Sequence, residues 1–135
     1  MSQKNKREIG TEIFKRCYGS SLMEPPPEGQ DPFFDIMLEN LFGSVWAREE
    51  VMSLRDRRLF TMGIIAALGE SDIFGIQCGC ALRNEEMTEE QLRELVIQAA
   101  PYAGYPRVNG LRTAVENAIN GFKHEQKAAQ QQQQQ

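Results

Sequence analysis

The stretch LRDRRLFTMGIIAALGESDIFGIQCGCALRN, residues 54–84, decides the fold. Its apolar residues recur three and four positions apart and do not alternate with polar ones, which is typical of α-helix and not of β-strand. Gly69 interrupts the apolar run, so we expect one helix to end there and a second to be capped by Ser71 or Asp72. The second half of the first helix is apolar on every face, which predicts that it is buried on all sides.

The same helical period continues on both sides of this stretch. Residues 5–18 predict a first amphipathic helix, three consecutive prolines then break the chain, and Pro32 starts the next helix. Downstream, a capping box beginning at Thr88 introduces a helix that we expect Pro101 and then the GYP of residues 104–106 to end, and a last helix follows from Pro106. The sequence therefore predicts an all-α fold of about six helices.

The composition is that of a globular domain. The chain has 135 residues, of which 41% are hydrophobic and 25% charged, with a net charge of −4. We expect a single domain over residues 1–125 and a polar, Gln-rich tail over residues 126–135 that is disordered or a frayed helix. The absence of a basic stripe argues against a nucleic-acid partner. No apolar run approaches a membrane span or follows the basic N-terminus as a signal would, so we expect a cytoplasmic protein with no membrane partner.

The sequence offers few of the side chains on which catalysis usually depends. His124 is the only histidine, which argues against a Ser/His/Asp triad, a Cys/His pair or a His-rich metal site. Cys78 and Cys80 lie two positions apart and would point about 200° from each other on a helix, so they cannot form a disulfide without unwinding it. Cys17 is the only other cysteine, too few for a metal site. We expect these cysteines to be small core residues.

Gln77 is unusual because the residues one turn away from it are all apolar: Ile73, Phe74, Cys80 and Ala81. A buried amide without hydrogen-bond partners costs about 1–3 kcal/mol. Gln77 is therefore expected either to bond to the surrounding backbone as a satisfied core residue or to line a pocket.

Several segments together resemble the carboxymuconolactone decarboxylase family, which has an alkyl hydroperoxidase D-like fold. They are FGSVWAR, LRDRRLFTMGIIAALG and ALRNEEMTEEQLRELVIQAAPYAGYP, within a similarity that runs from about Gly10 to Ile119. The resemblance implies an all-helical protein without a cofactor that assembles as a homo-oligomer, a trimer or hexamer. It also implies a small-molecule substrate, of which the best-known example is a carboxylated lactone.

The same resemblance draws attention to Gln77. The family's Glu-x-x-x-His pair would fall on Ile73 and Gln77, so this chain departs from that active site. The peroxidase branch of the fold carries Cys-x-x-Cys followed by a histidine, whereas this chain has Cys78-Gly-Cys80 and no histidine nearby. A glutamine cannot transfer protons near neutral pH, but its amide can donate a hydrogen bond to an enolate oxygen. The match to the histidine position favours Gln77 as a catalytic residue.

Five further residues are candidates for the same site, each with a structural alternative. Arg48 and Arg57 could each hold a substrate carboxylate through two donors of the guanidinium group. The structural alternative is that Arg48 is a surface residue and that Arg57 pairs with nearby acidic residues. Trp46 could form a pocket wall or belong to the core, and Tyr102 could donate a proton or anchor packing. Cys80 lies one helical turn from Gln77 and could bind the substrate or be a small core residue.

Three functional hypotheses remain open. The first is a cofactor-independent decarboxylase-like lyase, or an isomerase, that acts on a small conjugated or β-keto-type carboxylate or lactone through enolate stabilisation. The second is a thiol-dependent peroxidase or disulfide reductase on the same fold. The third is a non-catalytic oligomer that binds a small molecule. Large apolar residues early in the chain, including Phe33, Phe34 and Phe42, also favour an oligomer.

Overall fold

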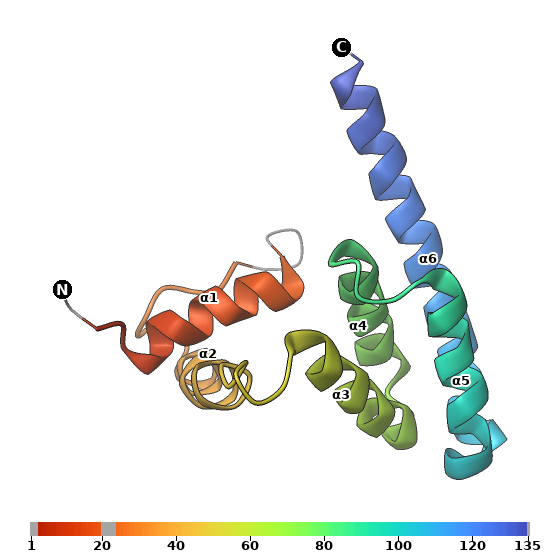
Figure 1. Ribbon diagram of the computed structural model, residues 1–135, viewed down its shortest axis with the longest axis horizontal. Coiled ribbons are helices and arrows are strands. Elements are labelled where there is room, and N and C mark those ends of the chain that lie inside the picture. The colour runs from red at the N-terminus through yellow and green to blue at the C-terminus, as the bar shows by residue number, and fades with distance from the viewer. Residues whose placement is uncertain (1–2, 20–23, 135) are drawn as a thin grey trace. The chain divides into compact units, whose positions relative to one another are not determined.

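The computed structural model describes residues 3–19 and 24–134, and over these residues the protein is all-α, which confirms the predicted fold class. The elements are α1 (Lys6–Tyr18), α2 (Pro32–Met37), the π-helix η1 (Leu38–Val45), α3 (Leu54–Leu68), α4 (Ser71–Arg83), α5 (Glu89–Ala103) and α6 (Tyr105–Gln133) (Figure 1). None of these helices is long and apolar enough to cross a membrane. The chain packs as two compact units, Met1–Arg57 and Arg58–Gln135.

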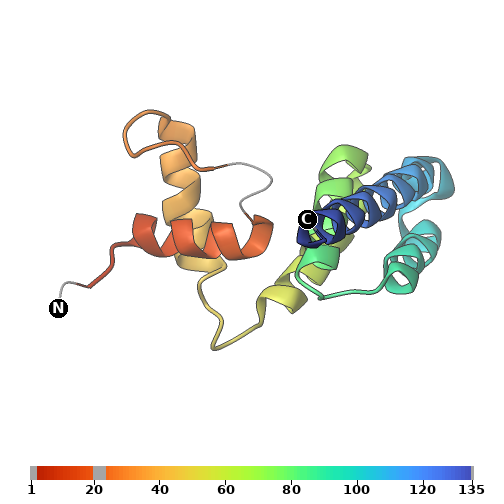
Figure 2. The ribbon, with the colours of Figure 1, turned by 90° about the horizontal axis from the view of Figure 1, so that it is seen from above.

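In the first unit, α1 crosses the continuous helix formed by α2 and η1 (Figures 1 and 2). Two glycines make this crossing close. A β-carbon on Gly10 would lie 1.8 Å from the carbonyl oxygen of Leu38, and one on Gly43 would lie 2.1 Å from the carbonyl oxygen of Lys6. Only residues without a β-carbon allow the two backbones to approach this closely.

The core of the first unit is largely aromatic. Phe14 contacts Phe42 edge to face with ring centroids 5.2 Å apart, and Trp46 packs against Phe42 at 6.1 Å. As predicted, the preceding helix begins at Pro32, where the side chain of Asp31 accepts hydrogen bonds from the first free N–H groups. The sequence did not predict that this helix would continue as a π-helix.

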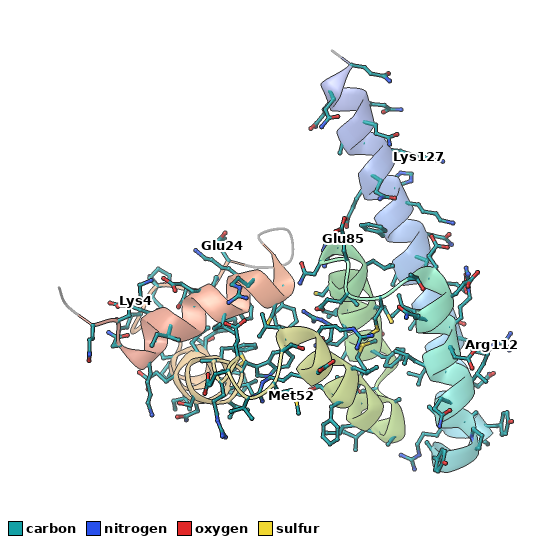
Figure 3. All side chains as sticks on the ribbon, in the orientation of Figure 1. Lys4, Glu24, Met52, Glu85, Arg112 and Lys127 are labelled. Atoms are coloured by element: carbon teal, nitrogen blue, oxygen red, sulfur yellow. The ribbon has the colours of Figure 1, made fainter. Side chains whose placement is uncertain are left out.

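In the second unit, α6 packs along both α4 and α5. The buried core side chains of this unit include Met62, Ile65, Phe74, Cys78, Leu92, Val96, Leu111, Val115 and Ile119. The C-terminal part of α6 extends beyond the neighbouring helices, as the position of Lys127 in Figure 3 shows. The Gln-rich segment is helical as far as Gln133, and its described side chains are exposed.

Two helix ends differ from the sequence-based expectation. α5 ends at the GYP stretch, as expected, with Ala103 as its last residue and Gly104 (φ 100°) as its cap, but Pro101 lies inside the helix and does not end it. A proline removes the hydrogen bond to the carbonyl four residues earlier, on Ile97. Ile97 and Pro101 are both exposed, so solvent can replace that bond. At the start of α4, the cap position is Glu70 and no side chain caps it, so the predicted cap by Ser71 or Asp72 is wrong.

The expectation that the second half of α3 is buried on all sides is also wrong. Met62, Ile65 and Ala66 are buried. The opposite face carries Phe60, Ile64 and Leu68, which are 71%, 50% and 62% exposed. These three residues, spaced by one helical turn, form an apolar face that we call the α3 stripe.

Candidate active site

Gln77 is hydrogen-bonded to a buried arginine. The Nη1 atom of Arg58, on α3, donates to Oε1 of Gln77, on α4, at 2.6 Å. Gln77 is 3% exposed and Arg58 is completely buried. Because a guanidinium has only donors, the atom of Gln77 that faces it must be the amide oxygen. The orientation of the amide is thereby fixed, and its NH₂ group forms the donor end of the side chain.

Glu86 completes this cluster from the turn after α4. The Nε atom of Arg58 donates to both carboxylate oxygens of Glu86, with Oε2 at 3.0 Å. The side chain of Glu86 is only 9% exposed. A charge moved out of water loses several kcal/mol of solvation, so a buried arginine needs a paired carboxylate and further acceptors. Glu86 supplies the opposite charge and Gln77 a neutral acceptor.

The end of α4 positions Glu86. The N–H of Glu85 bonds to the carbonyl of Leu82 and that of Glu86 to the carbonyl of Ala81, at 3.1 and 2.9 Å, which is the Schellman pattern. Glu85 has a φ of 55°, in the left-handed region that normally costs a non-glycine residue roughly 1–2 kcal/mol. Asn84, the residue before it, has a φ of −88° and lies outside that region. The turn at Glu85 (Figure 3) brings the next residue to Arg58.

The two cysteines of α4 lie in different surroundings. Cys78 belongs to the apolar core, and its burial raises the pKa of its thiol to about 12. Burial also raises the pKa of Cys80, although the nearby charges of Arg58 and Arg83 oppose that shift. Arg83 donates from Nη2 to the Cys80 sulfur at 3.4 Å. Both thiols are free and protonated near neutral pH, which disfavours a nucleophilic role.

No metal centre is visible in the part of the chain that the structure describes. Within residues 3–19 and 24–134, no three His, Cys, Asp or Glu side chains are placed to hold a metal ion.

Three of the predicted site residues belong to the first unit. Trp46 is a core residue, 5% exposed, in the aromatic cluster. Arg57 donates from Nη2 to the backbone carbonyl of Arg48 at 3.0 Å and from Nε to that of Met52 at 3.2 Å, so it stabilises the turn between η1 and α3. Arg48 itself is exposed.

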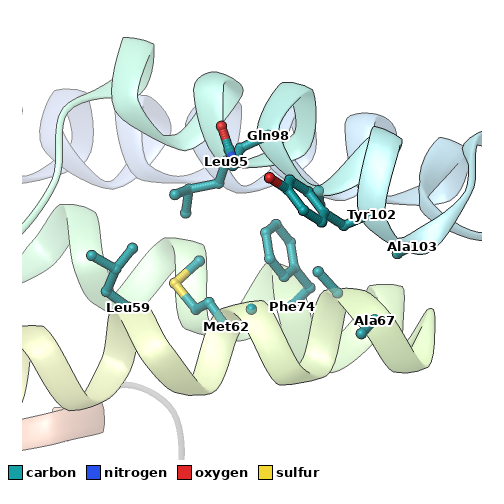
Figure 4. Close-up of a pocket in the computed structure, with 11 residues that line it drawn as sticks. Leu59, Met62, Ala67, Phe74, Leu95, Gln98, Tyr102 and Ala103 are labelled. Carbon is teal, nitrogen blue, oxygen red and sulfur yellow. The ribbon is translucent and has the colours of Figure 1, made fainter.

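Tyr102, in the second unit, does not join the Gln77 cluster. It is 86% exposed and lines an apolar cavity of about 360 Å³ between α3, α4 and α5 (Figure 4). The described lining of that cavity does not include Gln77, Arg58 or Glu86. The two residues predicted to be catalytic therefore lie in separate surroundings.

Arg58 and Glu86 were not predicted as site residues. Arg58 shares the helical register of Met62 and Ile65, so it is a polar residue on a buried face, the same signal that singled out Gln77. No sequence pattern pointed to Glu86, because it lies in a turn, where apolar residues do not recur at helical spacing.

Comparison with known proteins gives one family and two relatives. The model of the "Carboxymuconolactone decarboxylase family" matches residues 31–117, well over half of the chain. A "4-carboxymuconolactone decarboxylase" of Acinetobacter baylyi is 26% identical over 112 residues, covering 83% of this chain and 82% of the relative. The "Nitrosuccinic acid decarboxylase npaB" of Metarhizium robertsii is 28% identical over 115 residues, covering 82% and 79%. No solved structure gives a significant match.

Proposed function

The chain belongs to the carboxymuconolactone decarboxylase family, and from this premise we propose that it is a cofactor-independent decarboxylase that stabilises an enolate-type anion through Gln77. The substrate is a small carboxylate or lactone with an electron-accepting group next to the carbon that loses CO₂. Both relatives carry names of decarboxylases, and nitrosuccinic acid has a nitro group that accepts electrons as a conjugated carbonyl does.

In the proposed reaction, the bond between the carboxylate and its neighbouring carbon breaks and CO₂ leaves. The electron pair moves to the oxygen of the accepting group, and a proton from solvent then completes the product. The Gln77 amide donates to that oxygen as the negative charge develops, which is the role of an oxyanion hole. Neither Gln77 nor Arg58 transfers a proton near neutral pH.

The observation that supports this role most directly is the 2.6 Å hydrogen bond from Arg58 to Gln77. It fixes which end of the amide donates. A charged donor on the amide oxygen also polarises the amide, and neighbouring hydrogen bonds in a network strengthen one another. Arg58 is therefore a positioning residue in this proposal, and Glu86 holds Arg58 in place through the opposite charge.

Three other predicted residues have no part in this proposal. Arg48 and Arg57 both belong to the first unit, where Arg48 is exposed and the guanidinium of Arg57 bonds to backbone carbonyls. Tyr102 lines a cavity whose described lining excludes Gln77, so it is not given the proton-donor role.

We also propose that the protein assembles as a homo-oligomer, a trimer or hexamer. The support is the α3 stripe, whose three large apolar side chains are each at least half exposed. Clusters of exposed apolar residues commonly mark interaction sites. Light scattering coupled to size exclusion tests this, and a monomer at micromolar concentration contradicts it. In an oligomer that uses the stripe, Phe60→Asp and Ile64→Asp lower the mass, whereas Gln126→Asp on the exposed part of α6 does not.

The thiol-dependent alternative has less support. Burial raises the pKa of both Cys78 and Cys80, which lowers the fraction of reactive thiolate. Full retention of turnover in Cys80→Ser removes the alternative, whereas loss of a hydroperoxide-reducing activity in that variant revives it.

The experiment that tests the proposed function is a substrate panel. β-Keto acids, nitro acids and carboxylated lactones, each ¹³C-labelled at the carboxylate, are incubated with the protein, and labelled CO₂ and product are followed by NMR. Release faster than the uncatalysed rate from at least one class is expected. Binding of panel members without release would favour the non-catalytic alternative.

A further inference from the structure

The cavity between α3, α4 and α5 is a feature that the proposed reaction does not use. Its volume is about 360 Å³. An apolar cavity of roughly 150 Å³ already stays dry and binds benzene, and small-molecule sites begin at roughly 300 Å³. The cavity is therefore large enough to hold a ligand of about the size of one substituted ring.

The walls of the cavity lie on two facing helices and combine small residues with one leucine from each helix, Leu59 and Leu95. The small residues are Gly63, Ala66 and Ala67 on α3, and Ala99 and Ala103 on α5. Figure 4 shows Ala67 and Ala103 on opposite sides of the cavity. Because these side chains are short, they leave space between the helices that bulkier residues would fill, and the opposed walls favour a flat occupant.

The cavity also has an apolar floor of two larger side chains. Phe74 and Met62 line it, and each is only 1% exposed in the structure. An aromatic ring prefers edge-to-face or offset contact with another ring, and the polarisable sulfur of a methionine also contacts ring edges favourably. This floor suits an aromatic ligand better than an aliphatic one.

The polar side chains of the described lining are Gln98 and Tyr102, one turn apart on α5. Both are exposed, so they lie toward the solvent side of the cavity. None of the described lining residues is charged. A charged ligand would lose hydration here without gaining a partner, whereas one hydroxyl or carbonyl group could bond to the phenol or the amide.

We propose that this cavity is a second binding site, separate from Gln77, for a small, flat, uncharged aromatic compound with one hydrogen-bonding substituent. The ring lies between the small residues of α3 and α5 over Phe74 and Met62, and the substituent bonds to Tyr102 or Gln98. The ligand class differs from the anionic substrate proposed for the Gln77 cluster, so this inference does not depend on the decarboxylase proposal.

Phenol is the probe that tests this site, with benzoate as its charged counterpart. The full-length protein is labelled with ¹³C in the methionine methyl groups, and the Met62 signal is assigned by its absence in Met62→Leu. Phenol at millimolar concentration is expected to shift the Met62 methyl signal saturably, while benzoate does not. The signals of Met37 and Met52, in the first unit, serve as internal controls.

Filling the cavity gives the matched control. Ala99→Leu is expected to weaken phenol binding about tenfold, which corresponds to 1.4 kcal/mol, while Ala128→Leu on the exposed part of α6 leaves it unchanged. If Ala99→Leu does not fold, Ala67→Leu on the exposed side of the opposite wall replaces it. Tyr102→Phe should weaken phenol more than benzene. An unshifted Met62 signal, an equal response to benzoate, or undiminished binding in the filled variant overturns the proposal.

Discussion

Arg58 on α3 donates a hydrogen bond from Nη1 to Oε1 of Gln77 on α4, at 2.6 Å, and both side chains are buried in the second unit. The same guanidinium pairs with Glu86. Buried polar clusters of this kind stabilise a protein only while every member is present, because removing one leaves the others desolvated without a partner. The cluster therefore gives both a stability prediction and the central catalytic prediction.

Glu86→Ala is expected to lower the free energy of unfolding by about 3–5 kcal/mol, because it leaves the buried charge of Arg58 without its carboxylate. Urea denaturation measures this loss. The double variant Arg58→Met with Glu86→Leu should recover part of it, since an apolar pair removes both charges together, although Gln77 loses its hydrogen bond from Arg58. A single variant within about 0.5 kcal/mol of the parent protein would show that the pair is not a buried charge pair.

Glu85→Gly is expected to stabilise the protein by about 1 kcal/mol. Glu85 has a φ of 55°, and glycine adopts this region without the steric conflict of a β-carbon. Thermal unfolding should show a raised midpoint. The matched control is Asn84→Gly, at a φ of −88°, where glycine relieves nothing and only adds flexibility to the unfolded chain. An equal response of the two variants would contradict the assignment of strain to Glu85.

Gly10→Ala is expected to destabilise the first unit by about 3 kcal/mol or more, because its β-carbon would overlap the Leu38 carbonyl. Gly121→Ala gives the opposite expectation. Outside the adjacent residues and the backbone of its own helix, no described atom lies within 4 Å of a β-carbon at that position, and alanine favours the helix by roughly 0.5–1 kcal/mol. Circular dichroism during urea denaturation measures both. A Gly10→Ala protein as stable as its parent would contradict the close crossing of α1 and η1.

The thiols give a pH-dependent prediction. Burial raises the pKa of Cys78 from 9.0 to about 12, so the folded state keeps its proton where the unfolded state loses it. Between these two pH values the unfolded state binds fewer protons than the folded state. The free energy of unfolding therefore declines as pH rises from about 9 toward 12, by up to about 1.4 kcal/mol per pH unit for this one thiol. Unfolding experiments between these pH values measure the slope.

Cys78→Ala should flatten that decline, and an unchanged slope in the variant would contradict the raised pKa. The same burial predicts slow reaction of Cys78 with a thiol reagent at pH 8 in the native protein and fast reaction after denaturation.

Much of the fold could be predicted because it depends on local patterns. The structure contains both the capping box at Thr88 and the helix that begins at Pro32. Each feature involves only residues within a few positions of it, so it can be recognised from the sequence. The prediction that α3 is buried on all sides is wrong for one face. An apolar helix face can be recognised from the sequence, but the sequence pattern does not identify the element that packs against it. The π-helix was also missed, since its sequence differs little from that of an ordinary helix.

The candidate site was only partly predictable for a similar reason. A polar residue on an apolar face pointed to Gln77, but its partner Arg58 lies 19 positions earlier and Glu86 lies in a turn. Such contacts depend on how helices pack and not on spacing within one helix. Trp46 illustrates the opposite case, because an aromatic residue in a family motif can be a core residue, as its burial among Phe14 and Phe42 indicates.

The central claim is that the donor end of Gln77 stabilises the anion formed when CO₂ leaves. Its most direct test is turnover by Gln77→Glu on a substrate identified by the panel, because this variant keeps the shape and an acceptor for Arg58 but replaces the NH₂ donor with an oxygen. We predict that kcat falls by about 10²–10³-fold while urea denaturation still shows a folded protein. Unchanged kcat in a folded Gln77→Glu protein would contradict the claim.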